Sequence, residues 1–278
     1  MAIGFEDIKV TYVEIAAARK MSGLRIVLGA YPIPGPWREA CKGVYHVKGL
    51  KYTAVRSGDA GTSDLALGMG DTQAELIAWT GQASAPVVAW HDERPRAGWV
   101  DQLNLAERLA PEPALIPAGV DDRARMFGLA NELLGENGLV WVKRLLMVDG
   151  PLKTLPDNDP QREFWMFLGN KYGYTPAAAE AAALRIRDIV AALATQLASQ
   201  QAAGKRYLIG DSLSALDIYW AACCAILDPM SPERCPMADD FRGAYGNTDP
   251  RIEAALTPAL RAHRDFVYEQ HLELPVVF

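Results

Sequence analysis

Few residues of this sequence stand in patterns that are typical of catalytic or metal sites. The chain has no Gly-x-Ser-x-Gly elbow around a nucleophilic serine and no phosphate loop that ends in Gly-Lys-Ser or Gly-Lys-Thr. The histidines are dispersed, at His46, His91, His263 and His271. The cysteines have no metal-ligand spacing, and two of them are adjacent: they are Cys41, Cys223, Cys224 and Cys235. We expect no metal site, and buried free thiols rather than a redox centre.

The composition is that of an ordinary globular protein, and it excludes two classes of partner. The chain has 278 residues, of which 50% are hydrophobic, with a net charge of −6. Lysine and arginine form no basic patch, so we expect neither nucleic acid nor a membrane as a partner. The segment Met1–Asp7 is acidic where a signal peptide is positively charged, and no apolar run approaches the ~20 residues of a membrane helix. These features predict a cytoplasmic protein.

The first half of the chain is predicted to form an α/β domain. Residues 24–31 read as a buried strand, a proline-rich loop follows, and a helix is expected over 37–47. Gly49 is placed to end that helix in the left-handed conformation, and residues 51–56 read as a second strand. A strand, a helix and a strand with connections of this length predict two parallel strands.

Further elements follow from helical spacing and from breaks at proline and glycine. After a loop over 57–71, a short helix is expected over 72–79, with Thr72 and Glu75 as a capping box. A strand begins at Pro86, and an amphipathic helix spans 99–109. Later helices are predicted over 121–148, 160–172, 176–203, 214–228 and 251–270, with a long loop over 229–250. The expected domains are an N-terminal extension (1–21), an α/β domain (22–110), a linker (111–119) and an all-helical domain (120–278).

One stretch of the helical half resembles a known family. In Lys205–Trp220, Ser214 and Asp217 are spaced as a capping box, and the residues that follow are apolar on every face of a helix. The segment Leu208-Ile-Gly-Asp-Ser-Leu-Ser-Ala-Leu-Asp-Ile218 resembles the one that opens the core helix in cytosolic glutathione transferases, with Leu216 where the family usually has Ala. The resemblance covers about residues 22–228. It implies a thioredoxin-like glutathione-binding domain followed by a helical bundle domain.

The same resemblance implies which residues form the site. Tyr31 stands where the tyrosine-type enzymes carry the catalytic hydroxyl that bonds the thiolate of glutathione; backbone groups of 33–37 are the alternative donors. Gly35 stands before Pro36, where other types carry serine or cysteine. For binding glutathione, the resemblance implies a cis peptide at Ala85–Pro86, the pair Asp101–Gln102 for the γ-glutamyl end, and cations for the glycyl carboxylate. The cations near the expected elements are Arg38, Lys51 and Arg56.

The function implied by the resemblance is the addition of glutathione, as co-substrate, to an apolar electrophile, with a role in detoxification and a homodimeric assembly. Aromatic and apolar residues of the helical half could form the electrophile site, although helical spacing also suits a core: Phe127, Trp141, Leu145, Phe164, Trp165, Phe167 and Tyr172. One alternative is a non-catalytic glutathione-binding or structural protein, which Gly35 and Gln102 favour. Another is a glutathione-dependent lyase or reductase, for which Cys41 is poorly placed.

Overall fold

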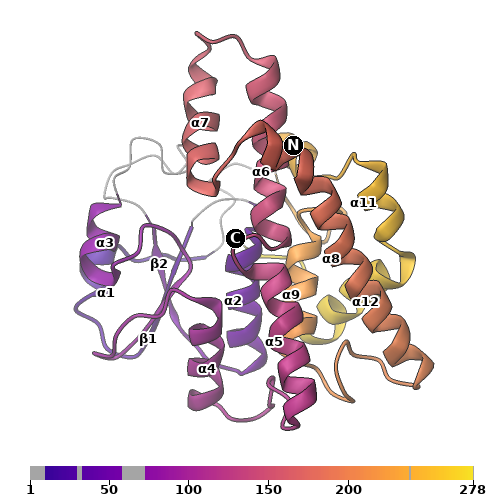
Figure 1. Ribbon diagram of the computed structural model, residues 1–278. Helices are drawn as coiled ribbons and strands as arrows, with labels where there is room; N and C mark the ends of the chain where they lie inside the picture. The colour runs from indigo at the N-terminus through magenta and orange to yellow at the C-terminus, as the bar shows by residue number, and fades with distance from the viewer. Residues whose placement is uncertain (1–9, 30–32, 58–72, 238, 278) are drawn as a thin grey trace. The chain divides into compact units, whose positions relative to one another are not determined.

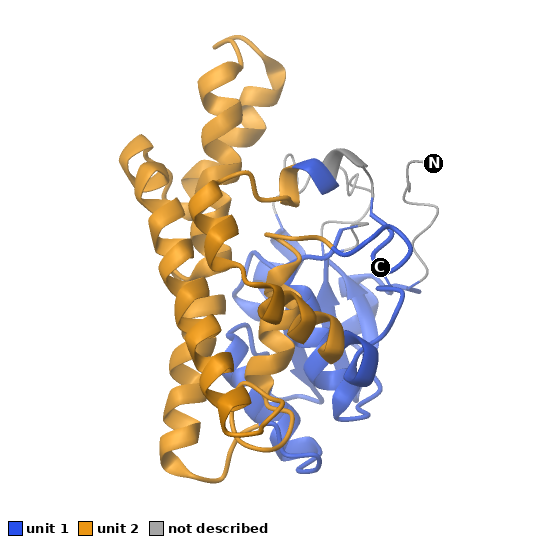
Figure 2. Ribbon diagram, turned by 90° about the vertical axis from the view of Figure 1, so that its right-hand side faces the viewer, with its two compact units in different colours: residues 1–115, 230–243, 268–278 blue, residues 116–229, 244–267 orange. Residues whose placement is uncertain are grey.

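The computed structural model describes residues 10–29, 33–57, 73–237 and 239–277 (Figure 1). The chain divides into two compact units (Figure 2). Unit 1 comprises residues 1–115, 230–243 and 268–278, and unit 2 comprises 116–229 and 244–267. The break at Leu115 falls in the proline-rich segment, but the grouping differs from the expected boundaries, which assign all of 120–278 to one domain. The domain boundaries therefore stay a prediction, and the units are used below.

The sheet of unit 1 has the expected parallel pair at its centre. The described strands are β1 (Leu24–Leu28), β2 (Thr53–Arg56) and β3 (Val87–Trp90), in the order β2-β1-β3. β1 runs parallel to β2 and antiparallel to β3. All five residues of β1 are buried, four of them apolar and one the arginine Arg25, so both faces of the sheet are covered at this strand. The predicted strand, helix, strand unit is confirmed.

Helix α2 (Pro36–Val47) connects the parallel strands. Pro36 occupies the first helical position, where a missing N–H costs nothing because that donor has no partner inside a helix. At the other end, Gly49 has a φ of +64°, and the N–H of Leu50 donates to the carbonyl of Tyr45 at 3.0 Å. This is the left-handed helix end that was predicted at Gly49.

The N-terminal segment pairs with the outer edge of β2. The Val13 N–H donates to the Ala54 carbonyl at 3.0 Å, and the Arg56 N–H donates to the Val13 carbonyl at 2.9 Å. The short helix α1 (Ile15–Ala18) then packs its buried Ile15 and Ala18 into the core beside the sheet. A free strand edge exposes unpaired backbone groups, so this segment protects β2 as well as adding to the core.

Two further helices complete the described α/β part. α3 (Ala74–Thr80) has Gln73, with φ +54°, at its N-cap, so the predicted cap at Thr72 is wrong; Thr72 itself lies outside the described residues. α4 (Trp99–Leu109) has the predicted bounds. It packs against α2, and the Tyr45 hydroxyl donates to the Gln102 carbonyl at 3.0 Å.

The helices after Leu115 follow the expected order with three differences. The predicted helix over 121–148 is two helices, α5 (Val120–Leu134) and α6 (Leu139–Thr154), because the chain turns between Gly135 and Gly138. A Cβ at Gly138 would lie 2.9 Å from the Asn131 carbonyl oxygen, so this turn requires glycine. The loop over 229–250 contains α10 (Asp239–Tyr245), and the final helix is split into α11 (Pro250–Ala255) and α12 (Pro258–His271). The remaining helices are α7 (Pro160–Tyr172), α8 (Pro176–Ala202) and α9 (Ala215–Cys224).

Helix α9 is the buried helix that its sequence predicted. All ten of its residues are buried, and the capping box of Ser214 and Asp217 is present. The Asp217 carboxylate accepts hydrogen bonds from the Ser214 N–H at 2.8 Å and from the Leu208 N–H at 2.7 Å. It also lies 2.8 Å from Nε2 of His263 on α12, a partner that sequence spacing did not indicate. Asp217 therefore joins three segments of unit 2.

Candidate functional site

The peptide bond between Ala85 and Pro86 is cis, as the resemblance implied. It lies directly before β3, with Pro86 buried and Ala85 half-buried. No hydrogen bond joins the Ala85 backbone to any other residue of the described ranges. A backbone N–H and carbonyl that lack a partner at the end of a sheet are available to an extended peptide ligand.

Gln102 supports this segment from α4. It is buried, and its side-chain nitrogen lies 3.0 Å from the Pro86 carbonyl oxygen, 3.2 Å from that of Ala97 and 3.3 Å from that of Arg96. An amide nitrogen has only two hydrogens, so these backbone acceptors occupy both of them. Gln102 thus ties the cis-proline segment to the start of α4. Asp101, its predicted partner in binding, is exposed in the first turn of α4.

Arg38 holds the connection between β1 and α2. Its guanidinium donates to the carbonyls of Gly29 and Ile33, and its Nε donates to Glu39 at 2.9 Å. Gly29 and Ile33 are the described residues on either side of 30–32, so the arginine fixes both ends of the segment that contains Tyr31. Tyr31 itself lies outside the described residues. These contacts position the backbone on both sides of 30–32, and the assignment of Arg38 to the glycyl carboxylate of glutathione stays a prediction.

Glu39 is a buried carboxylate between two cations. Burial acts to raise its pKa, but Lys42 at 3.0 Å and Arg38 at 2.9 Å outweigh this and hold the pKa below its ordinary value. Lys42 also donates to the Val277 carbonyl at 2.6 Å. Glu39 is therefore an anion that stabilises the folded state of unit 1 and has no proton to give near neutral pH.

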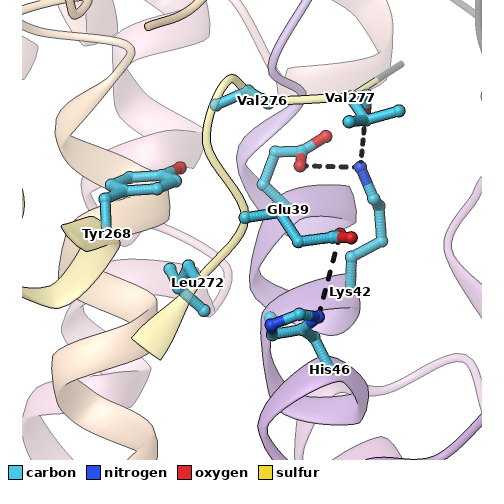
Figure 3. Close-up of a pocket in the computed structure, with 9 residues that line it drawn as sticks. Glu39, Lys42, His46, Tyr268, Leu272, Val276 and Val277 are labelled. Atoms are coloured by element: carbon cyan, nitrogen blue, oxygen red, sulfur yellow. Dashed lines mark hydrogen bonds and ion pairs between the residues drawn. The ribbon is translucent and has the colours of Figure 1, made fainter. Parts of the chain in front are cut away.

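A pocket in unit 1 lies between α2 and the C-terminal residues (Figure 3). Glu39, Lys42 and His46 come from α2, and Leu272 to Val277 come from the end of the chain. Glu39 pairs with Lys42 at 3.0 Å, and Nδ1 of His46 lies 3.9 Å from a carboxylate oxygen of Glu273. The pocket is the place where the C-terminal segment is anchored to α2, and it supplies no free group for chemistry.

The other predicted cations do not converge on Ala85 through any contact in the described ranges. Lys51 is exposed at the start of the β2 segment. Arg56 lies 3.6 Å from Glu14, which belongs to the N-terminal segment. Their assignment to the glycyl carboxylate of glutathione stays a prediction.

The cysteine thiols are buried and resist ionisation. Burial raises the pKa of Cys224 and of Cys235 to about 12, and it raises those of Cys41 and Cys223 as well. A thiol acts as a nucleophile only as the thiolate. None of the four is therefore prepared for attack at neutral pH, which agrees with the expectation of structural thiols.

The predicted aromatic set is spread over three helices of unit 2. Phe127 lies on α5, Trp141 and Leu145 lie on α6, and the others lie on or at the end of α7. Leu145 is buried, whereas the aromatic members are half-buried or exposed, with Phe167 44% exposed. Trp141 and Tyr172 meet edge to face at 5.0 Å and are joined by a hydrogen bond from the indole to the Tyr172 carbonyl at 3.1 Å. Aromatic surface is thus available to a ligand in unit 2.

The arrangement of the strands, the cis proline and the helices was compared with known proteins. No protein-family model and no curated protein matches the sequence. Solved structures do match over most of the chain. The chain has the glutathione S-transferase fold.

Three of these structures show the extent of the likeness. The beta-etherase LigF from Sphingobium sp. strain SYK-6 is 16% identical, with a TM-score of 0.52, over 87% of this chain and 99% of that one. A glutathione S-transferase from Xanthobacter autotrophicus Py2 is 14% identical, with a TM-score of 0.55, over 91% and 96%. Ure2p in complex with glutathione is 13% identical, with a TM-score of 0.55, over 91% and 100%. At these identities the likeness concerns the fold.

The described residues contain neither a metal-binding cluster nor a membrane-spanning helix. No group of three or more His, Cys, Asp and Glu side chains converges there as a metal site. No helix in the same ranges combines the length and the apolar composition needed to cross a membrane.

Proposed function

We propose that this protein binds glutathione and transfers its thiolate to an apolar electrophile. The observation that carries the proposal is the cis peptide at Ala85–Pro86, whose preceding residue has no backbone partner among the described residues, in a fold shared with a glutathione-bound protein. The cysteinyl unit of glutathione would pair with the Ala85 backbone as a short added strand. Asp101 would bind the γ-glutamyl amine. The working form would be a cytoplasmic homodimer.

Arg38 and Gln102 take positioning roles in this proposal. Arg38 holds the carbonyls of Gly29 and Ile33, the described residues that precede and follow 30–32. Gln102 holds the Pro86 carbonyl, so it keeps the Ala85 backbone in place. Tyr31, or a backbone N–H at the start of α2, would donate to the sulfur. Stabilising the thiolate by two pKa units requires about 2.7 kcal/mol, which a hydrogen bond together with a helix N-terminus supplies.

Binding can be tested by calorimetry with matched ligands. Glutathione and S-methylglutathione should both bind, because both keep the peptide backbone, whereas the dipeptide Cys-Gly should bind at least about tenfold more weakly because it lacks the γ-glutamyl unit. If neither glutathione nor S-methylglutathione binds, glutathione has no role here and the transferase and glutathione-binding proposals both fail.

Turnover is tested with a chromogenic aryl halide and the variant Tyr31→Phe. The variant should bind glutathione as the wild type does but react about tenfold or more slowly at pH 6.5, since the bound thiol loses its donor. Tyr174→Phe is the matched control, because its hydroxyl bonds Asp149 within unit 2 at 3.0 Å. Equal rates for Tyr31→Phe and the wild type would leave the backbone donors of α2 as the activating groups.

The non-catalytic alternative has a distinct outcome. A binding or structural protein would retain glutathione and show no conjugation with any aryl halide, and Gly35 at the N-cap of α2, without a hydroxyl or thiol, favours this result. A lyase or reductase that uses cysteine is disfavoured by the raised pKa of Cys41, which burial causes.

A further inference from the structure

The C-terminal segment, residues 272–277, belongs to unit 1 and is held against α2 (Figure 3). Val276 is 4% exposed, and its N–H donates to the Arg234 carbonyl at 2.8 Å. The carbonyl of Val277 accepts from the Lys42 ammonium at 2.6 Å. Lys42 lies on α2, so this hydrogen bond joins the C-terminal segment to the helix that follows β1.

Lys42 is also the first of three buried charged side chains on α2. Glu39 lies 3.0 Å from Lys42 and 2.9 Å from Arg38, and all three residues are buried. Removing one member of such a group leaves an uncompensated charge away from water, which is costly. The positions of the three side chains therefore depend on one another.

Arg38 is the member of this group that contacts the backbone on both sides of 30–32. Its guanidinium donates to the carbonyls of Gly29 and Ile33. The Gly35 N–H donates to the same Ile33 carbonyl at 2.9 Å. Printed side by side in space, these contacts continue from the C-terminal segment, through the charged residues of α2, to the backbone after β1 and before α2.

Stability alone does not account for charged residues at this place. Replacing a buried ion pair by apolar residues of similar volume is often neutral or stabilising, so an apolar contact between α2 and the C-terminal segment would hold the fold as well. Charged hydrogen bonds add direction. A guanidinium presents its donors in one plane, so the position of Arg38 determines where the two carbonyl oxygens that it holds can lie.

We propose that the C-terminal segment positions the backbone of Gly29 and Ile33 and is thereby part of the glutathione site. The contact runs through Lys42, Glu39 and Arg38, in that order. Lys42 and Glu39 are positioning residues, because they act through Arg38. The role in the glutathione site rests on the proposed function, whereas the coupling of the segment to this backbone can be measured without a ligand.

Amide hydrogen exchange on the full chain without glutathione measures the coupling. The reporter is the Gly35 N–H, which bonds the carbonyl that Arg38 also holds. Lys42→Met should raise its exchange rate about tenfold while the amides of β1 keep theirs, because the loss is local. Lys153→Met is the matched control, since it removes an exposed lysine that pairs with Asp149 at 2.7 Å. An unchanged Gly35 rate in Lys42→Met would overturn the proposal, and so would an equal rise in β1, which marks a global loss of stability.

A double-mutant cycle tests whether the effect passes through Arg38. Lys42→Met should add nothing to the Gly35 exchange rate in a chain that already carries Arg38→Met, since the contact through which it acts is gone. The same increase in both backgrounds would show that Lys42 acts by another route, against the proposal.

Val276→Gly tests the C-terminal segment itself. The variant loses a buried side chain and gains backbone freedom, so the segment is released and Gly35 exchange should rise about threefold to tenfold. Glu273→Gln is the control in the same segment, because its carboxylate is exposed and 3.9 Å from His46. If Val276→Gly exchanges like Glu273→Gln, the segment has no positioning role.

Glutathione binding, measured by calorimetry, connects the coupling to the proposed function. Lys42→Met and Val276→Gly should each raise the Kd of glutathione about threefold to tenfold, and Glu273→Gln should leave it unchanged. Unchanged affinity in both variants, with binding by the wild type, would overturn the inference and leave the proposed function standing. If the wild type binds no glutathione, the proposed function fails, and the role of the segment in a glutathione site fails with it.

Discussion

Unit 2 contains two buried charged residues, Asp217 and Lys143, whose hydrogen-bond partners differ. Asp217 is fully buried and accepts from the Ser214 N–H, the Ser214 hydroxyl and the Leu208 N–H, with His263 also at hydrogen-bond distance. Lys143 is 5% exposed, and its ammonium donates to the Gly246 carbonyl at 3.0 Å, with no carboxylate partner among the described residues. Asp217 therefore has several donors within unit 2, whereas the described part of the chain gives Lys143 a backbone acceptor and no opposite charge.

This difference indicates two different roles. A buried carboxylate with several donors joins segments and makes the helical arrangement unique, because any other packing would leave it unpaired. A buried cation without an opposite charge keeps an uncompensated desolvation cost, so Lys143 stabilises the fold less than Asp217 does. The comparison therefore assigns the larger contribution to stability to Asp217.

The largest expected effect is that of Asp217→Ala. Removing the carboxylate strands the Leu208 and Ser214 donors and the buried His263, so the free energy of unfolding should fall by about 3–5 kcal/mol. A helix cap alone would account for about 0.5–2 kcal/mol. Denaturant unfolding measures the loss. Asp211→Ala is the control, because Asp211 is exposed and its ion pair with Lys205, at 3.4 Å, lies at the surface. If Asp217→Ala lost no more stability than this control, Asp217 would not join the segments of unit 2.

The next effect is a pH dependence from Lys143. Its pKa in the folded state is about 8, against an ordinary 10.5, because burial disfavours the charged form. Between these values the unfolded chain binds more protons than the folded one, so raising the pH from 8 to 10 should increase the free energy of unfolding by about 2 kcal/mol relative to Lys143→Met. Parallel pH profiles of the two proteins would show that Lys143 is not desolvated.

The smallest expected effect is on the stability of Arg144→Met, a change at the residue that follows Lys143 in α6. With no carboxylate left behind, and with the methionine able to fill part of the space, the free energy of unfolding should change by about 1 kcal/mol or less. The measurement uses the same denaturant titration as for Asp217→Ala. A loss of 3 kcal/mol or more, on the scale expected for Asp217, would mean that Arg144 holds the fold and would remove the contrast between the two regions.

Local sequence rules predicted the parts of the fold that depend on neighbouring residues. Gly49 ends α2 in the left-handed conformation, α4 has the expected bounds, and Ser214 with Asp217 starts α9. The cis peptide at Ala85–Pro86 came from the resemblance to a family rather than from any local rule. The helix end at Gly49 and the cap of α9 are decided within a few residues, by backbone conformation and by local hydrogen bonds.

The contacts that the sequence did not predict involve partners that local patterns do not mark. Nothing near Val13 indicates that it pairs with Val55, and nothing near Arg38 indicates that its guanidinium donates to two backbone carbonyls. The turn at Gly135–Gly138 is marked in the sequence by two glycines three residues apart, but helical spacing on both sides predicts one continuous helix over 121–148. For Lys143 and Arg144 the available signal was a pair of cations inside an otherwise apolar helix.

The sequence by itself determined most of the elements and the buried helix α9, because helix caps, periodicity and proline breaks act over short distances. The glutathione transferase architecture followed from the resemblance of the segment Leu208–Ile218 to that family. Only the tertiary structure decided which charges are satisfied. Asp217 acquires His263 from a helix 46 residues later, whereas Lys143 meets the Gly246 carbonyl and, in the part of the chain that the structure describes, no carboxylate. Satisfaction of a buried charge depends on which side chains packing brings together, and no local pattern encodes that.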